Sequence, residues 1–332
     1  MIGNKPFLLR PAAKDHLWGG SRLNDDFAKG IDMFPLAETW ECSTHPDGIS
    51  TVASGEHAGE SLARVLQAHP EYLGTHSLAV TEGKPELPIL IKLIDANRDL
   101  SVQVHPDDVY AREKENGAWG KTEMWYVLQV RKGAELVYGF NQDVSKECVR
   151  KAIKTETIGR YLNHVPAHKG DLFLIEAGTV HAIGAGVLVA EIQQNSNLTY
   201  RMYDYGRVDK NGKPRELHVD KALDVANLKA STSLPQPVRA LKYQNGCASE
   251  LLTRCKYFQV ERLLLNTETH RDLTSFQTNG SSFCALLCTD GCGVLFGTDF
   301  MLNIFKGDCI FVPANSMELK LHGKAQFLSV CC

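Results

Sequence analysis

The sequence predicts a mainly β protein built from two β-barrels with a few inserted helices. Most of its 332 residues fall into short apolar runs bounded by Gly, Pro, Asn or Asp, a pattern typical of strands. Only three segments space their apolar residues as helices do. A strand–turn–strand pattern that begins at Lys169 recurs at Lys306, an offset of 306 − 169 = 137 residues. This recurrence favours a duplicated barrel, and two unrelated hairpins are the alternative.

Composition excludes several classes of protein. Hydrophobic residues make up 43% and charged residues 23%, and the 36 basic and 39 acidic residues give a net charge of −3. Such a balance, without any basic run, argues against nucleic-acid binding. No apolar run reaches the roughly 18 residues of a membrane span, and the apolar stretch near the first residue is too short for a signal peptide. The ten cysteines contain no Cys-x-x-Cys pair, so we expect reduced thiols in a cytoplasmic protein.

The elements follow from local patterns. Apolar residues at helical spacing predict helices over 60–74 and 216–230, and one or two helices over 145–165, broken at Gly159. Nearly every other apolar run predicts a strand; examples are "LPILIKLIDA", "EMWYVLQV", "GDLFLIEA", "GVLVAEIQ", "KYFQVERLLL", "CALLCTDGCGVLF" and "AQFLSV".

A polar, proline-containing stretch, "STSLPQPVRAL" over 231–241, predicts a linker. It divides the chain into domains 1–240 and 241–332, each with one copy of the repeated pattern. The first copy has His181 where the second has Glu318. If the repeat binds a metal, we expect only the first copy to do so.

The segment "LSVQVHPDD" places polar side chains on one face of a strand. Alternation puts Ser101, Gln103 and His105 on one side and the intervening valines on the other. Pro106 then ends the strand, and Asp107 or the residue after it can cap a following helix. A row of Ser, Gln and His is unusual for a face that is only core.

Two further residues can join this row. The chain returns as a strand with Lys121 and Glu123 on one face, and antiparallel pairing with the first strand would bring Glu123 beside His105. His181 follows a tight glycine turn and opens another strand. Gln103, His105, Glu123 and His181 would form an N2O2 set that favours zinc, with iron, manganese or cobalt possible. The alternative is that each is an ordinary polar residue with its own partner.

A later segment, "AEIQQNSNLTYRMYDYGR", adds an acid and a base. Alternation places Glu191 and Gln193 on one face of a strand, and Arg201 follows among three tyrosines. The arginine either forms a structural ion pair with Asp204 or recognises an anion. The residues alone favour the ion pair.

Four motifs together resemble the type I mannose-6-phosphate isomerases of the cupin superfamily; they are "AETWECSTHPDGIS", "LSVQVHPDD", "GKTEMWYVL" and "AGTVHAIGAGVLVAEIQQNSNLTYRMYDYGR". The resemblance runs from about residue 6 to the end, and the length is similar to that of the short bacterial form. It implies two cupin-type barrels of the double-stranded β-helix or jelly-roll kind. The domain 1–240 would be catalytic and bind the metal, and 241–332 would be a cupin-like barrel without metal.

The resemblance also implies site residues. One Zn2+ per chain would be bound by Gln103, His105, Glu123 and His181, although Gln103 is a weak or absent ligand in some short members. The catalytic residues would be Arg201, Glu191 and Lys121, and the substrate-binding residues Ser101, Lys121 and Arg201. Thr122 stands where the family usually has Pro; we expect little effect, because its side chain points away from the site.

The implied activity is that of a zinc-dependent isomerase that interconverts mannose 6-phosphate and fructose 6-phosphate through an enediol. Glu191, Lys121 and a zinc-bound water are candidates for the proton-transfer base, and Lys121 and Arg201 for the phosphate. The alternatives are a non-catalytic, sugar-binding cupin, or a metal-dependent cupin enzyme for a different sugar. We expect a small phosphosugar as partner, no nucleic acid or membrane, and a monomer or weak homo-oligomer.

Overall fold

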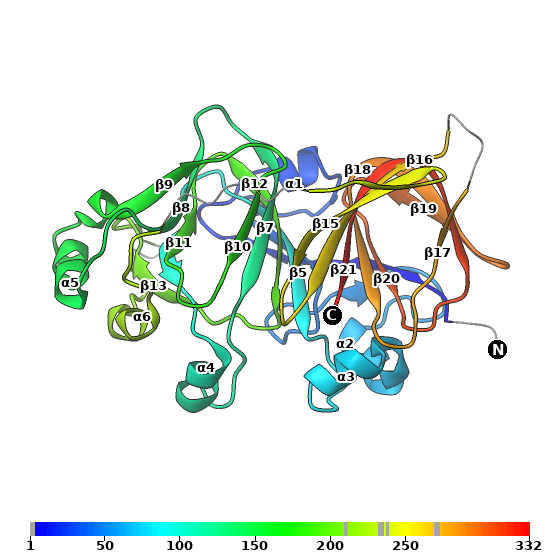
Figure 1. Ribbon diagram of the computed structural model, residues 1–332, viewed down its shortest axis with the longest axis horizontal. Coiled ribbons are helices and arrows are strands. Elements are labelled where there is room, and N and C mark those ends of the chain that lie inside the picture. Colours follow the sequence, from blue (N-terminus) through cyan, green and yellow to red (C-terminus); the bar gives the residue numbers. More distant parts are fainter. Residues whose placement is uncertain (1–3, 209–211, 232–235, 237–238, 269–272) are drawn as a thin grey trace.

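The computed structural model describes residues 4–208, 212–231, 236, 239–268 and 273–332, and it is mainly β, as predicted (Figure 1). The strands gather into two bodies that lie side by side. The described helices are α1 (Arg22–Asp25), α2 (Leu62–Ala68), α3 (Thr75–Val80), α4 (Asp108–Lys114), α5 (Lys146–Lys154) and α6 (Val219–Val225), with 3-10 turns η1 (Pro70–Leu73) and η2 (Ile158–Arg160).

Two sheets form the first barrel. The six-stranded sheet has the order β10 (Leu172–Ile175), β7 (Glu123–Val130), β12 (Val187–Gln194), β5 (Ile89–Asp95), β3 (Glu38–Cys42) and β2 (Ala12–Lys14). The five-stranded sheet has the order β13 (Tyr200–Tyr203), β6 (Val102–Val104), β11 (His181–Ile183), β8 (Glu135–Phe140) and β9 (Leu162–Pro166).

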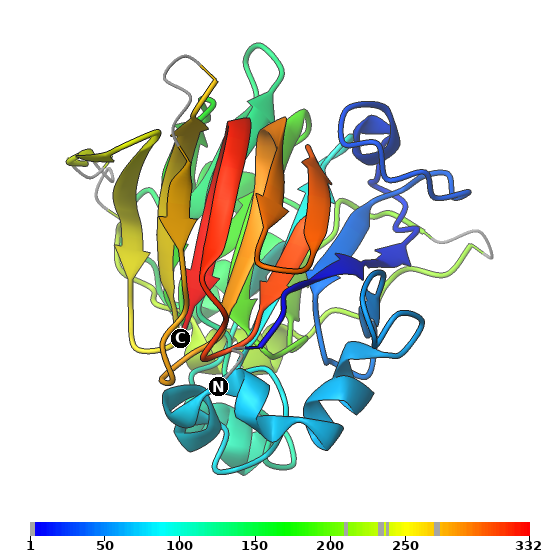
Figure 2. The ribbon, with the colours of Figure 1, turned by 90° about the vertical axis from the view of Figure 1, so that its right-hand side faces the viewer.

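The second barrel is a ten-stranded sheet that also takes in two strands from the beginning of the chain. Figure 2 shows β1, in dark blue, beside the orange and red strands of this sheet. Its main path is β14 (Lys242–Gln244), β15 (Cys247–Arg254), β16 (Gln259–Asn266), β21 (Leu319–Cys331), β18 (Cys284–Phe296), β20 (Cys309–Val312), β1 (Phe7–Arg10) and β4 (Thr51–Val52); β17 (Thr274–Phe276) pairs with β21, and β19 (Met301–Phe305) with β18. The division at residues 240 and 241 stays a prediction.

Both faces of the six-stranded sheet are buried. Along β12, Val187 and Val189 pack inside the first barrel, whereas Leu188, Ala190 and Ile192 pack into the core shared with the second barrel. A strand covered on both faces has no polar side to alternate, which explains the continuous apolar runs in the sequence. The sheet is therefore the common wall of the two barrels.

One predicted strand pairing is wrong. We expected the strand that contains His105 to pair with the strand that begins at Glu123, but β6 pairs with β11 and β13, and β7 pairs with β10 and β12. The two strands belong to different sheets. His105 and Glu123 still meet, because the sheets face one another across the interior of the barrel.

The predicted helices are shorter than the apolar spacing suggested. Over 145–165, α5 stops at Lys154, and the remainder forms η2 and the strand β9 rather than a second helix. Over 216–230, only α6 is helical, and over 60–74 the chain forms α2 and η1. The predicted linker 231–241 lies largely outside the described residues. Within the described part of the chain, no helix is long and apolar enough to cross a membrane.

Candidate active site

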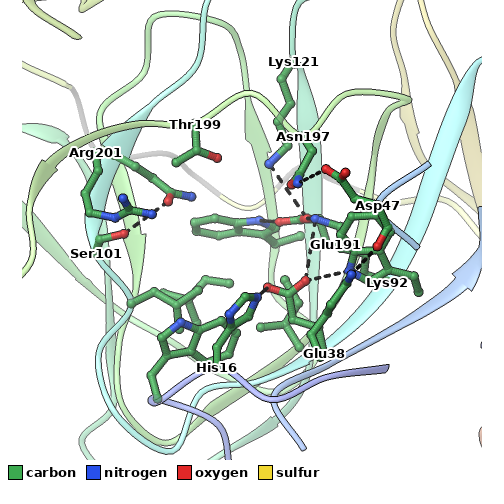
Figure 3. Close-up of a pocket in the computed structure, with 18 of the residues that line it drawn as sticks. His16, Glu38, Asp47, Lys92, Ser101, Lys121, Glu191, Asn197, Thr199 and Arg201 are labelled. Atoms are coloured by element: carbon green, nitrogen blue, oxygen red, sulfur yellow. Dashed lines mark hydrogen bonds and ion pairs between the residues drawn. The ribbon is translucent and has the colours of Figure 1, made fainter. Parts of the chain in front are cut away.

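A cavity of about 510 Å³ lies between the two sheets of the first barrel, and its lining is unusually rich in charge. Figure 3 shows Glu191 in the middle of this cavity, with Ser101 and Arg201 toward one side and Lys92 and Glu38 toward the other. The lining side chains are Lys14, His16, Trp18, Glu38, Trp40, Asp47, Lys92, Ile94, Leu100, Ser101, Gln103, Lys121, Trp125, Ile183, Glu191, Asn197, Thr199, Arg201 and Arg215.

Three predicted ligands converge next to this cavity. One ligand atom each from His105, Glu123 and His181 lies within 4.8 Å of the others, and all three residues are buried. The Nε2 atoms of His105 and His181 lie 3.4 Å from opposite oxygens of the Glu123 carboxylate. The residues come from the end of β6 and the starts of β7 and β11, so three strands of two sheets place them.

Local hydrogen bonds orient the two imidazoles. The Nδ1–H of His181 donates to the carbonyl of Thr179 at 2.8 Å, which leaves the Nε2 lone pair directed at Glu123. On the other strand, the carbonyl of His105 accepts the N–H of Gly178 at 2.9 Å, so the turn before His181 is tied to His105.

The protonation states are those that a metal site needs. Burial lowers the pKa of His181, and burial together with the Lys121 ammonium lowers the pKa of His105 to about 3. Burial opposes ionisation of Glu123, but Lys121 and His105 outweigh it and hold its pKa well below the ordinary range. Two neutral imidazoles and one carboxylate can bind a cation without first releasing protons.

Unsatisfied polar atoms support the same conclusion. Both carboxylate oxygens of Glu123 are buried without a hydrogen-bond partner among the described residues. The Lys121 ammonium lies 2.6 Å from one of these oxygens, but only as an ion pair without hydrogen-bond geometry. Buried acceptors of this kind are rare in folded proteins unless an ion or water completes them. The residues present therefore fit a divalent metal ion.

The amide of Gln103 presents its nitrogen to the site. Nε2 lies 3.3 Å from Nε2 of His181, and the amide oxygen accepts from the Ser101 hydroxyl at 3.4 Å. Only the opposite amide orientation would turn the oxygen toward a metal. The prediction that Gln103 is a ligand stays a prediction.

Two buried charges beside Glu191, those of Lys92 and Glu38, escaped the sequence analysis. Lys92 Nζ lies 3.1 Å from Oε1 of Glu191 and 3.9 Å from Oε2 of Glu38. Trp40 and Trp125 donate indole N–H bonds to Glu38 and Glu191, at 2.7 and 3.0 Å. The only signal in the sequence was a lysine within the apolar run "LPILIKLIDA".

Glu191 has the properties of a proton acceptor. It is 3% exposed and lines the cavity, and burial, with a contribution from Glu123, raises the pKa of its carboxyl. A buried carboxyl with a raised pKa can exchange a proton closer to neutral pH than an exposed one.

Arg201 is not held by the ion pair that the sequence favoured. In the described structure its Nη1 donates to the carbonyl of Glu216 at 2.8 Å, and its buried Nε has no hydrogen-bond partner. Asp204 instead pairs with Arg207 and accepts two bonds from Arg215, at 2.7 and 2.5 Å. Arg201 and Arg215 therefore reach the cavity lining together, and sequence analysis missed Arg215.

Known proteins resemble this chain in both sequence and structure. Residues 7–133 match the family described as phosphomannose isomerase type I, catalytic domain. The mannose-6-phosphate isomerase ManA of Bacillus subtilis is 35% identical over 97% of both chains, and the mannose-6-phosphate isomerase of Streptococcus mutans is 40% identical over 68% of both. The crystal structure of the mannose 6-phosphate isomerase from Bacillus subtilis superimposes with a TM-score of 0.88, at 33% identity over 98% of this chain and 99% of that chain.

Proposed function

Because this chain belongs to the type I phosphomannose isomerases, we propose that it interconverts mannose 6-phosphate and fructose 6-phosphate. The observation that carries the proposal is a cavity lined by a buried carboxyl with a raised pKa and by two arginines, with a buried His–Glu–His group directly beside it. The mannose-6-phosphate isomerases of Bacillus subtilis named above support it over at least 97% of the chain.

The metal of this site is, in our proposal, one zinc ion per chain. His105, Glu123 and His181 would hold it, and Gln103 would be a fourth ligand with its amide oxygen turned inward. Imidazole and carboxylate ligands with an open position suit a catalytic zinc. When bound, the ion would polarise an oxygen of the substrate as a Lewis acid.

Glu191 is the proposed base. The reaction takes a proton from one carbon of the C1–C2 pair of the open-chain sugar and returns it to the other, through an enediol. Trp125 donates to Oε2 of Glu191 and Lys92 lies 3.1 Å from Oε1, so the carboxyl that lines the cavity is held in a fixed orientation toward the substrate. Lys121, 4.0 Å from that same Oε1, would stabilise negative charge that develops on the sugar oxygens.

Arg201 and Arg215 are the proposed anchors for the phosphate, with the Ser101 hydroxyl beside Arg201 (Figure 3). Asp204 is shared between Arg215 and Arg207, and only Arg215 of these two lines the cavity, so Arg201 and Arg215 present positive charge there. A phosphate dianion would neutralise this charge and provide the partner that Nε of Arg201 lacks. Arg201 would therefore assist the reaction by holding the phosphate in place and by its positive charge, and it would not transfer the proton.

The remaining proposal concerns the compartment. All ten cysteines are free thiols, and several are fully buried in the cores. This usage suits a reducing cytoplasm, where phosphorylated sugars are metabolised.

Two measurements on the purified protein test the function. Elemental analysis should find one zinc per chain, and a coupled assay should show turnover of mannose 6-phosphate but not of free mannose. Removal of the metal with a chelator should abolish turnover, and added Zn2+ should restore it. Equal turnover of free mannose, or full activity of the metal-free protein, would refute the proposal.

A further inference from the structure

One short turn of the second barrel contacts the first barrel close to the candidate site. Residues 255–258 connect β15 and β16. From this turn the hydroxyl of Tyr257 donates to Oδ2 of Asp108 at 2.9 Å, and the exposed Lys256 ammonium lies 3.3 Å from the same oxygen. Asp108 belongs to the first barrel, at the start of α4.

The other oxygen of Asp108 faces the segment that leads into β7. Oδ1 accepts the backbone N–H of Gly120 at 3.1 Å and the side-chain amide of Gln194 at 2.8 Å. Although burial opposes ionisation, the bonds from Gln194 and Tyr257 lower the pKa of Asp108, so it is a carboxylate that accepts from all sides. Its side chain is only 15% exposed.

Gln194 extends this contact by two residues. The side-chain amide oxygen of Gln194 accepts the backbone N–H of Thr122 at 2.8 Å. The backbone N–H of Gln194 donates to the backbone carbonyl of Thr122 at 3.1 Å. At Gly120 a Cβ would lie 2.5 Å from the backbone of Asp107 and Asp108, so this segment is packed directly against the start of α4. Gly120 and Thr122 are thus both fixed from outside the cavity.

The residues that alternate with these two carry the chemistry. Lys121 and Glu123 point inward, where the ammonium and carboxylate lie 2.6 Å apart beside His105. In an extended chain, anchoring every second residue from outside sets the positions of the inward side chains. A displacement of the anchors would move both groups at once.

We infer that Tyr257 is a positioning residue, through which the second barrel holds Lys121 and Glu123 in place by way of Asp108. Among the described residues, the second barrel contributes no side chain to the cavity lining, so it can act on the site only through contacts such as this hydroxyl bond and the bond from Arg262 to Tyr126 of β7 at 3.2 Å. The inference rests on the proposed function for its catalytic readout. Groups that hydrogen-bond metal ligands directly change metal affinity or activity about 10- to 100-fold when removed, and because Tyr257 acts through Asp108 we expect the lower end of this range.

Tyr257→Phe tests the inference by removing one oxygen and keeping the ring. We expect kcat to fall about tenfold with KM within about twofold, and zinc to bind about tenfold more weakly. Hydrogen exchange at the amides of Gly120 and Thr122 should become faster. Tyr243→Phe is the matched control, since this tyrosine of the same barrel is 79% exposed and should show none of these effects. Asp108→Asn should give a larger loss than Tyr257→Phe.

A purely structural hydroxyl would behave differently. It would lower the melting temperature of Tyr257→Phe but leave kcat, zinc affinity and the two exchange rates at wild-type values, and that result would overturn the inference. If the wild-type protein did not turn over mannose 6-phosphate, the proposed function would fail by itself. Zinc affinity and hydrogen exchange would then still decide the role of Tyr257.

Discussion

The strand–turn–strand units at 169–194 and 306–331 have similar backbone conformations but different side chains in the barrel interior. Gly178 and Asn315 occupy the same place in the two units, since 315 − 178 = 137, and both have positive φ, 88° and 53°. Gly186 and Gly323 also correspond and have φ of 93° and 130°. The matching left-handed residues support the duplication inferred from the sequence, because such positions are uncommon for any residue except glycine.

The side chains on this common backbone differ in kind. Where the first unit places the buried His181, the second has Glu318, which is 63% exposed and paired with Lys320. Where the first has Glu191 in the cavity, the second has Leu328, fully buried in an apolar core. The two barrels therefore differ in a few inward-pointing side chains and not in the path of the backbone, and these side chains give only the first barrel groups that can act in chemistry.

The largest difference should be seen when His181 and its counterpart Glu318 are each replaced by alanine. His181→Ala should lose the bound metal and more than about a hundredfold of kcat/KM, because it removes a ligand outright. Glu318→Ala at the corresponding place should keep metal content and activity, with a change in stability within about 0.5 kcal/mol. Metal analysis and steady-state kinetics of both variants check this. Wild-type metal content in His181→Ala would contradict the assignment.

A smaller difference in kcat/KM should be seen between substitutions of Arg215 and Arg207, the two arginines that pair with Asp204. Arg215→Gln should lower kcat/KM for mannose 6-phosphate about 10- to 100-fold, since a bond to a charged group contributes about 1.5–3 kcal/mol. Inorganic phosphate should also become a weaker competitive inhibitor. Arg207→Gln removes the other partner of Asp204 but no lining residue of the cavity, so we expect less than about a threefold change. Equal losses in both variants would mean that Asp204, and not the phosphate, needs Arg215.

The smallest effect concerns the pH dependence of kcat/KM. The buried Glu191 can titrate, whereas Leu328 at the corresponding position of the second barrel cannot. Trp125→Phe removes a hydrogen bond to the ionised carboxylate, so the already raised pKa of Glu191 should rise further. Because the base must be ionised, activity is lost as pH falls through this pKa. The acid limb of kcat/KM should therefore move to higher pH, with little change on the alkaline side. Trp119→Phe, outside the cavity lining, should leave the profile unchanged.

Sequence patterns predicted which way the site residues point better than they predicted their partners. Alternation placed Ser101, Gln103 and His105 on one face correctly, because this face depends only on neighbouring residues. The pairing of β6 was wrong because its neighbours, at His181 and Arg201, lie about 80 and 100 residues further along the chain. Local periodicity carries no information on such distant contacts.

Buried charges were the other gap. Lys92 lies in β5, which is buried on both faces, so no polar face of the strand marked it as functional. The ion pair expected between Arg201 and Asp204 does not form, because Asp204 pairs instead with Arg207 and Arg215, which lie further along the chain. The roles assigned to the site residues came from motif resemblance, and they stay proposals.

The pairing of β1 with β20 has a consequence for how this protein is made. Phe7 and Phe311 are register partners separated by 311 − 7 = 304 residues. On the ribosome the first strand is synthesised long before its hydrogen-bonding neighbour emerges, and such distant pairings are slow to form. The nascent chain therefore carries an unpaired, apolar edge for most of its synthesis, a stage at which chaperones or early partners would have the most to protect.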